Sequence, residues 1–133
     1  MASIQQSPLL SLLLVEDDKT ACDLVARMVT LNFPHSKIYI AENGMQGVEL
    51  FRKHAPDIVI TDISMPEMDG IEMAREIKVI NPLATYIVLT ARNDNDTYEK
   101  FKKIGFCAFL PKPLNYRDLF KAIEKCSPHK PLG

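Results

Sequence analysis

Short apolar runs alternate along the chain with longer stretches in which apolar residues recur every three to four positions. Runs of β-branched residues and leucine bounded by turn residues predict buried strands. A period near 3.6 predicts helices that bury one face. The predicted strands are residues 9–15, 37–41, 57–61, 85–90 and 106–110, and the predicted helices are 19–31, 44–53, 70–80, 94–104 and 115–126.

These elements make five strand–helix units in strict alternation. Strands joined through helices run parallel, with right-handed crossovers. The pattern therefore predicts an α/β fold with a doubly wound, five-stranded parallel sheet, of flavodoxin-like (βα)5 type with strand order 2-1-3-4-5. We expect one domain over residues 9–126, a disordered tail at 1–8, and a flexible tail or the start of a linker at 127–133. In the first helix, the apolar positions expected to face the sheet are Ala21, Leu24, Val25, Met28, Val29 and Leu31.

Composition and charge remove some classes of function. The 16 basic and 17 acidic residues give a net charge of −1. This is not the excess of positive charge that direct binding to nucleic acid or to an anionic membrane requires. The apolar run 9–15 is too short to span a bilayer. Cys22, Cys107 and Cys126 are odd in number and match no metal or redox spacing, so we expect reduced, buried thiols and a cytoplasmic location.

Chemically active residues follow the predicted strands. Glu16 and Asp17 end the first strand, Asp62 the third and Thr90 the fourth, while Lys112 follows the fifth. The carboxyl ends of parallel strands meet at one edge of such a sheet. Clustered carboxylates repel one another unless a cation lies among them, and oxygen ligands without imidazole or thiolate select Mg²⁺, with Mn²⁺ as an alternative. With a phosphoryl donor, one carboxylate becomes a nucleophile.

Four motifs occur in order, each at a predicted strand end: Val15-Glu16-Asp17-Asp18; Val59-Ile60-Thr61-Asp62 with Met65-Pro66 and Met68-Asp69-Gly70; Val88-Leu89-Thr90-Ala91; and Leu110-Pro111-Lys112-Pro113. In these motifs the chain resembles the receiver domain of bacterial two-component response regulators, over nearly its whole length. Each motif is weak alone, but four in this order are specific.

The resemblance implies a metal and phosphorylation site. Asp62 matches the phosphoacceptor. Asp17 matches the direct Mg²⁺ ligand and Glu16 a ligand acting through water, with Asp62 and the backbone carbonyl of Ser64 completing the set. The side chains of Ser64 and Arg92 fall at positions that tune dephosphorylation in the family.

The resemblance also implies the residues that respond to phosphorylation. Thr90 matches the switch hydroxyl, with Ala91 beside it in the phosphate-binding segment, and Lys112 matches the phosphate-pairing lysine. Phe109 falls where the family carries its switch aromatic. The Lys112–Pro113 peptide bond matches one that is cis in the family.

The function implied is that of a signalling module rather than an enzyme acting on a separate substrate. A histidine kinase or phosphotransfer protein would phosphorylate Asp62, and the face formed by residues 94–126 would change for partner binding. The output would be an unknown downstream protein or a fused effector domain, and phosphorylation could drive homodimerisation. The sequence leaves open a free-standing receiver and a receiver belonging to a larger regulator or hybrid kinase.

Each site residue also has a purely structural interpretation. Asp18 is expected only to cap the following helix. An enzymatic alternative comes from Glu16-Asp17-Asp18-Lys19-Thr20, which nearly matches the Asp-x-Asp-x-Thr signature of haloacid-dehalogenase-like phosphatases. That alternative puts Glu16 at the nucleophile position, provides no room for a substrate cap and leaves Asp62 unexplained.

Overall fold

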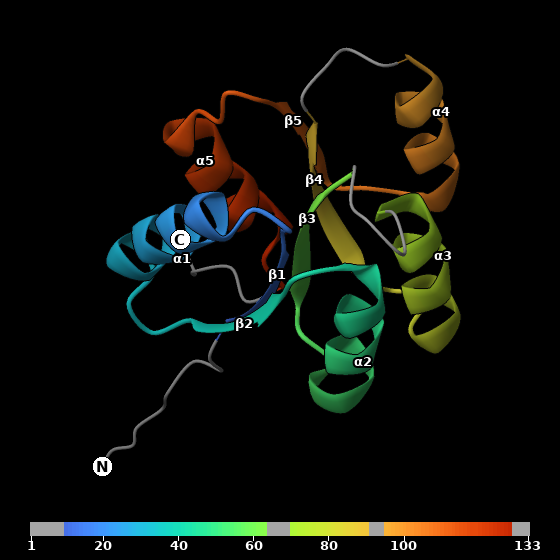
Figure 1. The fold of residues 1–133 in the computed structure, drawn as a ribbon, viewed down its shortest axis with the longest axis horizontal. Coiled ribbons are helices and arrows are strands. Elements are labelled where there is room, and N and C mark those ends of the chain that lie inside the picture. Colours follow the sequence, from blue (N-terminus) through green and yellow to red (C-terminus); the bar gives the residue numbers. More distant parts are fainter. Residues whose placement is uncertain (1–9, 64–69, 91–94, 129–133) are drawn as a thin grey trace.

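The computed structural model describes residues 10–63, 70–90 and 95–128 and contains the ten predicted elements in the predicted order (Figure 1). The strands are β1 (Ser11–Val15), β2 (Lys37–Ala41), β3 (Ile58–Asp62), β4 (Thr85–Thr90) and β5 (Ala108–Pro111). The helices are α1 (Lys19–Asn32), α2 (Gly44–His54), α3 (Gly70–Ile80), α4 (Asn95–Ile104) and α5 (Tyr116–Cys126).

The five strands form one parallel sheet in the order β2-β1-β3-β4-β5, which confirms the predicted topology. Helices α1 and α5 cover one face of the sheet, and α2, α3 and α4 cover the other (Figure 1). Because β1 and β3 are neighbours, the residues that follow these two strands meet at the same edge. Within the described ranges, every helix is too short or too polar to cross a bilayer.

The central strands are buried because both faces of the sheet are covered. All five residues of β3 are buried, as are Leu12 to Val15 of β1. A strand buried on both faces has a continuous apolar run as its sequence, and β1 follows this pattern. The edge strand β2 is only partly buried.

Side-chain caps mark the starts of α1 and α5. The carboxylate of Asp18 accepts a hydrogen bond from the backbone N–H of Ala21 at 3.1 Å, and Asn115 accepts one from Asp118 at 3.2 Å. Both residues are N-caps, so the predicted capping role of Asp18 is confirmed.

The buried face of α1 differs from the predicted one. Cys22, Val25 and Val29 are buried, whereas Leu24 is 50% exposed and Leu31 is 73% exposed. At about 100° per residue, Leu24 and Leu31 lie more than a quarter turn away from Val25, on the opposite side from Cys22 and Val29. The expectation that Leu24 and Leu31 face the sheet was therefore wrong.

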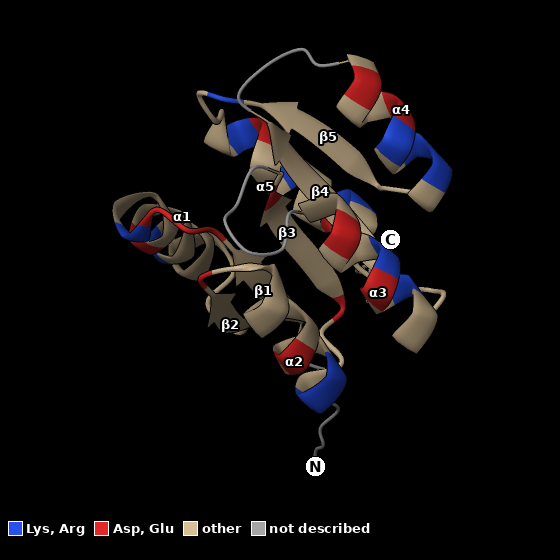
Figure 2. Ribbon diagram, turned by 45° about the vertical axis from the view of Figure 1, so that its right-hand side comes forward, with Lys and Arg blue, Asp and Glu red and all other residues tan. Residues whose placement is uncertain are grey.

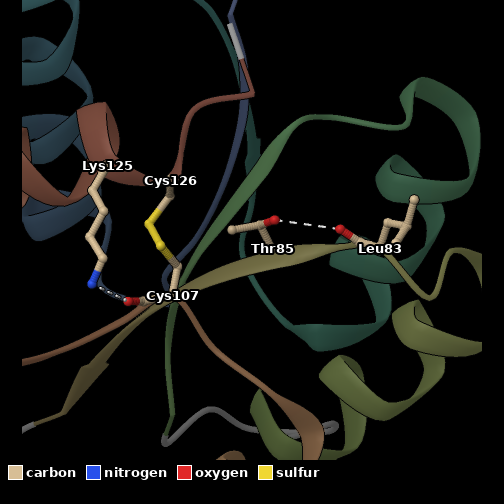
Figure 3. The surroundings of a disulfide bond; sticks show 5 residues. All are labelled: Leu83, Thr85, Cys107, Lys125 and Cys126. Atoms are coloured by element: carbon tan, nitrogen blue, oxygen red, sulfur yellow. Dashed lines mark hydrogen bonds between the residues drawn. A yellow bond between two sulfur atoms is a disulfide. The ribbon is translucent and has the colours of Figure 1, made fainter. Parts of the chain in front are cut away.

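The cysteines correct a second expectation. Cys107 and Cys126 form a disulfide, with their Cα atoms 6.0 Å apart (Figure 3), so the prediction of reduced thiols was wrong for these two residues. The physical reason is the return path of α5, which runs back along β5 and ends beside the start of that strand. Cys22 is free and buried, as expected.

Candidate functional site

Three carboxylates converge at the carboxyl edge of the sheet. Glu16 and Asp17 directly follow β1, and Asp62 is the last residue of β3. Each offers an oxygen within 4.8 Å of the other two. The acidic segment between β1 and α1 is visible in red in Figure 2. Glu16 and Asp62 are buried, whereas Asp17 is exposed, so the cluster opens to solvent on the Asp17 side.

Glu16 is held in place by both of its carboxylate oxygens. Oε2 accepts a hydrogen bond from the backbone N–H of Asp18 at 3.2 Å, and Oε1 lies 3.4 Å from the Nζ of Lys112. Burial raises the pKa of Glu16, and the negative charge of Asp62 adds to this; the backbone hydrogen bond and the ammonium group oppose it. The net shift of the pKa is upward, as expected for a buried carboxylate that also lies beside another carboxylate.

Asp62 is 8% exposed, and its two carboxylate oxygens have different partners. Oδ1 accepts a hydrogen bond from the backbone N–H of Ile63 at 2.7 Å, and Oδ2 lies 3.1 Å from the Nζ of Lys112. Gly70 packs against this segment so closely that a Cβ atom there would lie 2.8 Å from the carbonyl oxygen of Asp62. The start of α3 therefore supports the backbone that carries the carboxylate.

Lys112 reaches the cluster from the turn after β5. Its backbone N–H donates to the carbonyl oxygen of Thr90 at 2.7 Å, and the Lys112–Pro113 peptide bond is cis, as the resemblance implies. Partial burial lowers the pKa of the ammonium, but the hydrogen bond to Asp62 and the charges of Asp62 and Glu16 raise it more, so its pKa is raised. Lys112 is therefore a fixed positive charge shared by two carboxylates.

Thr90 and Phe109 lie on the same face of the sheet. Phe109 pairs with Val88 across β4 and β5, and side chains two residues apart on a strand share a face. Thr90, the last residue of β4, is buried. The ring of Phe109 lies 5.3 Å from those of Tyr98 and Phe106, forming an aromatic cluster between α4 and β5. The predicted switch hydroxyl and switch aromatic thus lie on adjacent strands, on the same face of the sheet, which α4 covers.

The donor set fits a hard divalent cation. Of the three carboxylates, Glu16 and Asp62 are buried and share the ammonium of Lys112, so a further positive charge would relieve the repulsion within the cluster. Carboxylate oxygens at an edge open to water match the preference of Mg²⁺ for one or two carboxylates and several waters. Glu16, Asp17 and Asp62 are the described residues that could hold it.

Three predicted site residues fall in the segments between the described ranges. Ser64, Ala91 and Arg92 lie outside the described residues, so their assignments stay predictions. Sequence reasoning did not anticipate two backbone donors, the N–H groups of Ile63 and Asp18, because backbone direction after a strand is not encoded in residue type. The contacts of Tyr98 and Phe106 with Phe109 were likewise not predicted from the sequence.

A doubly wound sheet whose edge gathers an acidic cluster, a buried hydroxyl residue and a paired lysine defines a class of phosphate-handling signalling domains. The family model for the response regulator receiver domain matches residues 12–124. The chain belongs to this family, whose members accept phosphoryl groups on aspartate. The phosphatase alternative gains no support from the comparisons.

Curated relatives differ in how much of their length the chain represents. It is 34% identical over 122 residues to the transcriptional regulatory protein ZraR of Klebsiella oxytoca, covering 92% of this chain but 27% of that protein. It is 33% identical to the chemotaxis protein CheY and 30% identical to sporulation initiation phosphotransferase F, both of Bacillus subtilis, and covers 94% of each; these matches span 85% and 89% of this chain. The chain thus spans about a quarter of the first relative and nearly all of the other two.

Solved structures show the same fold. A response regulator receiver domain protein from Clostridium thermocellum is 30% identical with a TM-score of 0.81, covering 89% of this chain and 94% of that one. The CheX–CheY–BeF3–Mg²⁺ complex from Borrelia burgdorferi contains a chain that is 25% identical with a TM-score of 0.80; the match covers 86% of both chains. These matches confirm the flavodoxin-like fold.

Proposed function

We propose that Asp62 accepts a phosphoryl group from a histidine kinase or a phosphotransfer protein, and that this changes the face formed by residues 94–126. The observation that carries the proposal is the placement of the Lys112 ammonium 3.1 Å from Asp62, at the edge that also gathers Glu16 and Asp17. In the reaction, a carboxylate oxygen of Asp62 attacks the phosphorus of a phosphohistidine, and the bond from phosphorus to the imidazole nitrogen breaks.

Each residue has a distinct part in this reaction. Lys112 neutralises charge on the phosphoryl oxygens, while the N–H of Ile63 keeps the carboxylate oriented. Glu16, Asp17, Asp62 and the Ser64 carbonyl would hold Mg²⁺, or alternatively Mn²⁺. When bound, the cation supplies further neutralisation of the same charge. The similar CheY from Borrelia burgdorferi, which was crystallised in a complex with CheX, BeF3 and Mg²⁺, supports this assignment.

Phosphorylation supplies enough energy for a conformational switch. Moving a two-state equilibrium from 1:99 to 99:1 requires about 5.5 kcal/mol of differential interaction. A hydrogen bond to a charged group contributes roughly 1.5–3 kcal/mol, so two or three new ones suffice. We assign one of them to the hydroxyl of Thr90, with the segment at Ala91 moving toward the phosphoryl group. Phe109, on the same face as Thr90, would then follow into the space that this movement releases.

The output of the signal is also part of this proposal. Because the ZraR relative is a much longer transcriptional regulatory protein, a fused effector domain is one output, and a separate downstream protein is the other. We propose a cytoplasmic location, phosphorylation-dependent homodimerisation of the 94–126 face, and tuning of dephosphorylation by Ser64 and Arg92. The domain limits 9–126 and the tail or linker at 127–133 belong to this proposal.

Intact mass spectrometry tests the phosphoacceptor directly. The protein is incubated with a small acyl phosphate and Mg²⁺, and we expect the mass of one phosphoryl group to be added. Asp62→Asn should abolish this gain, while Asp23→Asn, which alters an exposed carboxylate on α1, should leave it unchanged. A phosphoryl group retained by Asp62→Asn would refute the assignment.

A further inference from the structure

The disulfide lies at the edge of the sheet opposite the acidic cluster. Cys107 directly precedes β5, and Cys126 is the last residue of α5. The bond closes a covalent ring between two cysteines that are 19 positions apart in sequence, and this ring contains Phe109, the Lys112 turn and the whole of α5. Figure 3 shows the bond joining the end of the helix to the start of the strand. One covalent link therefore encloses two of the residues to which we assign the phosphorylation response.

Helix α5 has packing contacts on the sheet besides this bond. Leu119 and Ile123 are fully buried, and they pack in the core cluster that also contains β1, β3 and β4 residues. The N-terminal end of the helix is capped by Asn115. An apolar face of this kind supplies most of the stability of a docked helix. Both the bonded and the reduced forms are therefore expected to be folded, which is the condition for a reversible modification.

The surroundings favour thiol–disulfide exchange at Cys107 and Cys126 over exchange at Cys22. Cys107 is half-buried, and the Nζ of Lys125 lies 3.5 Å from its carbonyl oxygen. Partial exposure lets a small disulfide reach this cysteine, whose thiolate is the nucleophile in disulfide exchange, while the Lys125 contact holds only its backbone. Cys22, in contrast, is 3% exposed, and burial together with Asp23, Glu16 and Glu42 raises the pKa of its thiol. Cys22 therefore stays protonated and out of reach.

We propose that Cys107 and Cys126 form a reversible oxidation site, and that closing their disulfide restrains the last turns of α5 on β5. Its consequence for signalling rests on the proposed function of Asp62. In a cytoplasmic protein such a bond is expected to be transient, since cytosolic disulfides are usually catalytic or redox-sensing. Oxidation of this pair would thus be a second covalent modification, besides phosphorylation of Asp62, that acts on the 94–126 face.

The oxidant is a low-molecular-weight disulfide. The Cys107 thiolate attacks one of its sulfur atoms, forming a mixed disulfide and releasing one thiolate. The Cys126 thiolate then attacks the Cys107 sulfur, forming the protein disulfide and releasing the second thiolate. The two protein thiols lose two electrons and two protons, and the oxidant gains them as two thiols.

Alkylation in glutathione buffers tests reversibility. The native chain is equilibrated at a series of reduced-to-oxidised glutathione ratios, quenched with acid, alkylated and weighed. We expect Cys107 and Cys126 to pass together from alkylated to protected as the buffer becomes oxidising, and Cys22 to be alkylated only after denaturation. A pair that stays bonded across the whole series, or stays as two thiols, would overturn the proposal.

Hydrogen exchange tests the restraint without any phosphoryl chemistry. In the unphosphorylated protein, amides in the last turns of α5 should exchange roughly tenfold faster after reduction, while those of α2 should not change. The Cys22→Ser variant should show the same difference, and the Cys126→Ser variant should exchange at the reduced rate in both buffers; equal rates in both redox forms would contradict the restraint. Circular dichroism of Cys126→Ser and of a second variant, Cys107→Ala, establishes that the variants are folded.

Phosphorylation is then measured in both redox forms, so that the two proposals can fail separately. If Asp62 takes no phosphoryl group while the exchange results hold, only the proposed function fails. If Asp62 is phosphorylated and α5 exchange is unaffected by reduction, only the redox proposal fails.

Discussion

Replacing Lys112 by alanine separates the proposed chemical part of this residue from a structural one. The ammonium lies 3.1 Å from an oxygen of Asp62 and 3.4 Å from one of Glu16, and the lysine side chain is 31% exposed. Its removal leaves two buried carboxylates facing each other without a counter-charge. Two quantities should then move in opposite directions: the rate of phosphorylation should fall, and the affinity for Mg²⁺ should rise.

The size of the effect follows from the contacts. A hydrogen bond from a charged group to a phosphoryl oxygen is worth roughly 1.5–3 kcal/mol, and each 1.36 kcal/mol is about tenfold in rate, so phosphorylation should slow roughly 10- to 150-fold. Breaking a fully buried ion pair costs about 3–5 kcal/mol, but Lys112 is partly solvated. We therefore expect a loss of roughly 1–2 kcal/mol in the free energy of unfolding. Added Mg²⁺ should restore much of this loss, because it neutralises the same carboxylates.

The assay combines three measurements on Lys112→Ala. Intact mass gives the phosphorylation rate with a small acyl phosphate, isothermal titration calorimetry gives the Mg²⁺ affinity, and urea unfolding with and without Mg²⁺ gives the stability. Lys121→Ala, which removes an exposed lysine on α5, is the matched control and should change none of them. A folded Lys112→Ala protein whose phosphorylation rate is unchanged, or whose Mg²⁺ affinity falls, would refute the reasoning.

Three further changes probe the site and its supports. Asp17→Asn should lower Mg²⁺ affinity at least about tenfold by calorimetry, with little change in urea unfolding because this carboxylate is exposed; unchanged affinity would remove Asp17 from the metal site. Gly70→Ala should cost roughly 1–3 kcal/mol in urea unfolding, since its Cβ would lie 2.8 Å from the Asp62 carbonyl oxygen, whereas in Gly47→Ala the closest atom met is a flexible methionine sulfur, so that variant should cost less. Burial raises the pKa of Tyr86, so above about pH 10, where an unfolded tyrosine ionises, the free energy of unfolding should fall by up to about 1.4 kcal/mol per pH unit. Tyr86→Phe should lack this contribution, and identical alkaline slopes in the two proteins would contradict it.

The sheet and its order were predictable because burial on both faces leaves a simple record in the sequence. A strand such as β3 must be apolar along its length until it reaches the edge, so the position of Asp62 after Ile58-Val59-Ile60 already marked the edge of the sheet. Parallel connections through helices then required all five strands to end on the same side. The convergence of Glu16, Asp17 and Asp62 follows from these two facts.

The limits of prediction appear where several faces of a helix are apolar. In α1, apolar residues cover more than half of the helix circumference, so periodicity alone could not select the stripe of Cys22, Val25 and Val29 over one that includes Leu24 and Leu31. Only the position of the helix on the sheet makes that choice. In α4 the reverse holds: the helix is strongly charged (Figure 2), and Phe101 is nevertheless fully buried.

The cysteine pair was missed for a different reason, and the predicted fold contained part of the answer. The 11 residues of α5 rise about 1.5 Å each and span about 16 Å, while the five steps from Cys107 to Lys112 at about 3.3 Å each span a similar length. A helix that returns along its own strand over an equal length must end level with the start of that strand, so Cys126 had to lie near Cys107. Cys22 lies in the first turn of α1, near the opposite edge of the sheet, and could not reach either of the other two cysteines. Matching element lengths thus selects the correct pair among three cysteines, and the distance of 6.0 Å between their Cα atoms is what the structure adds.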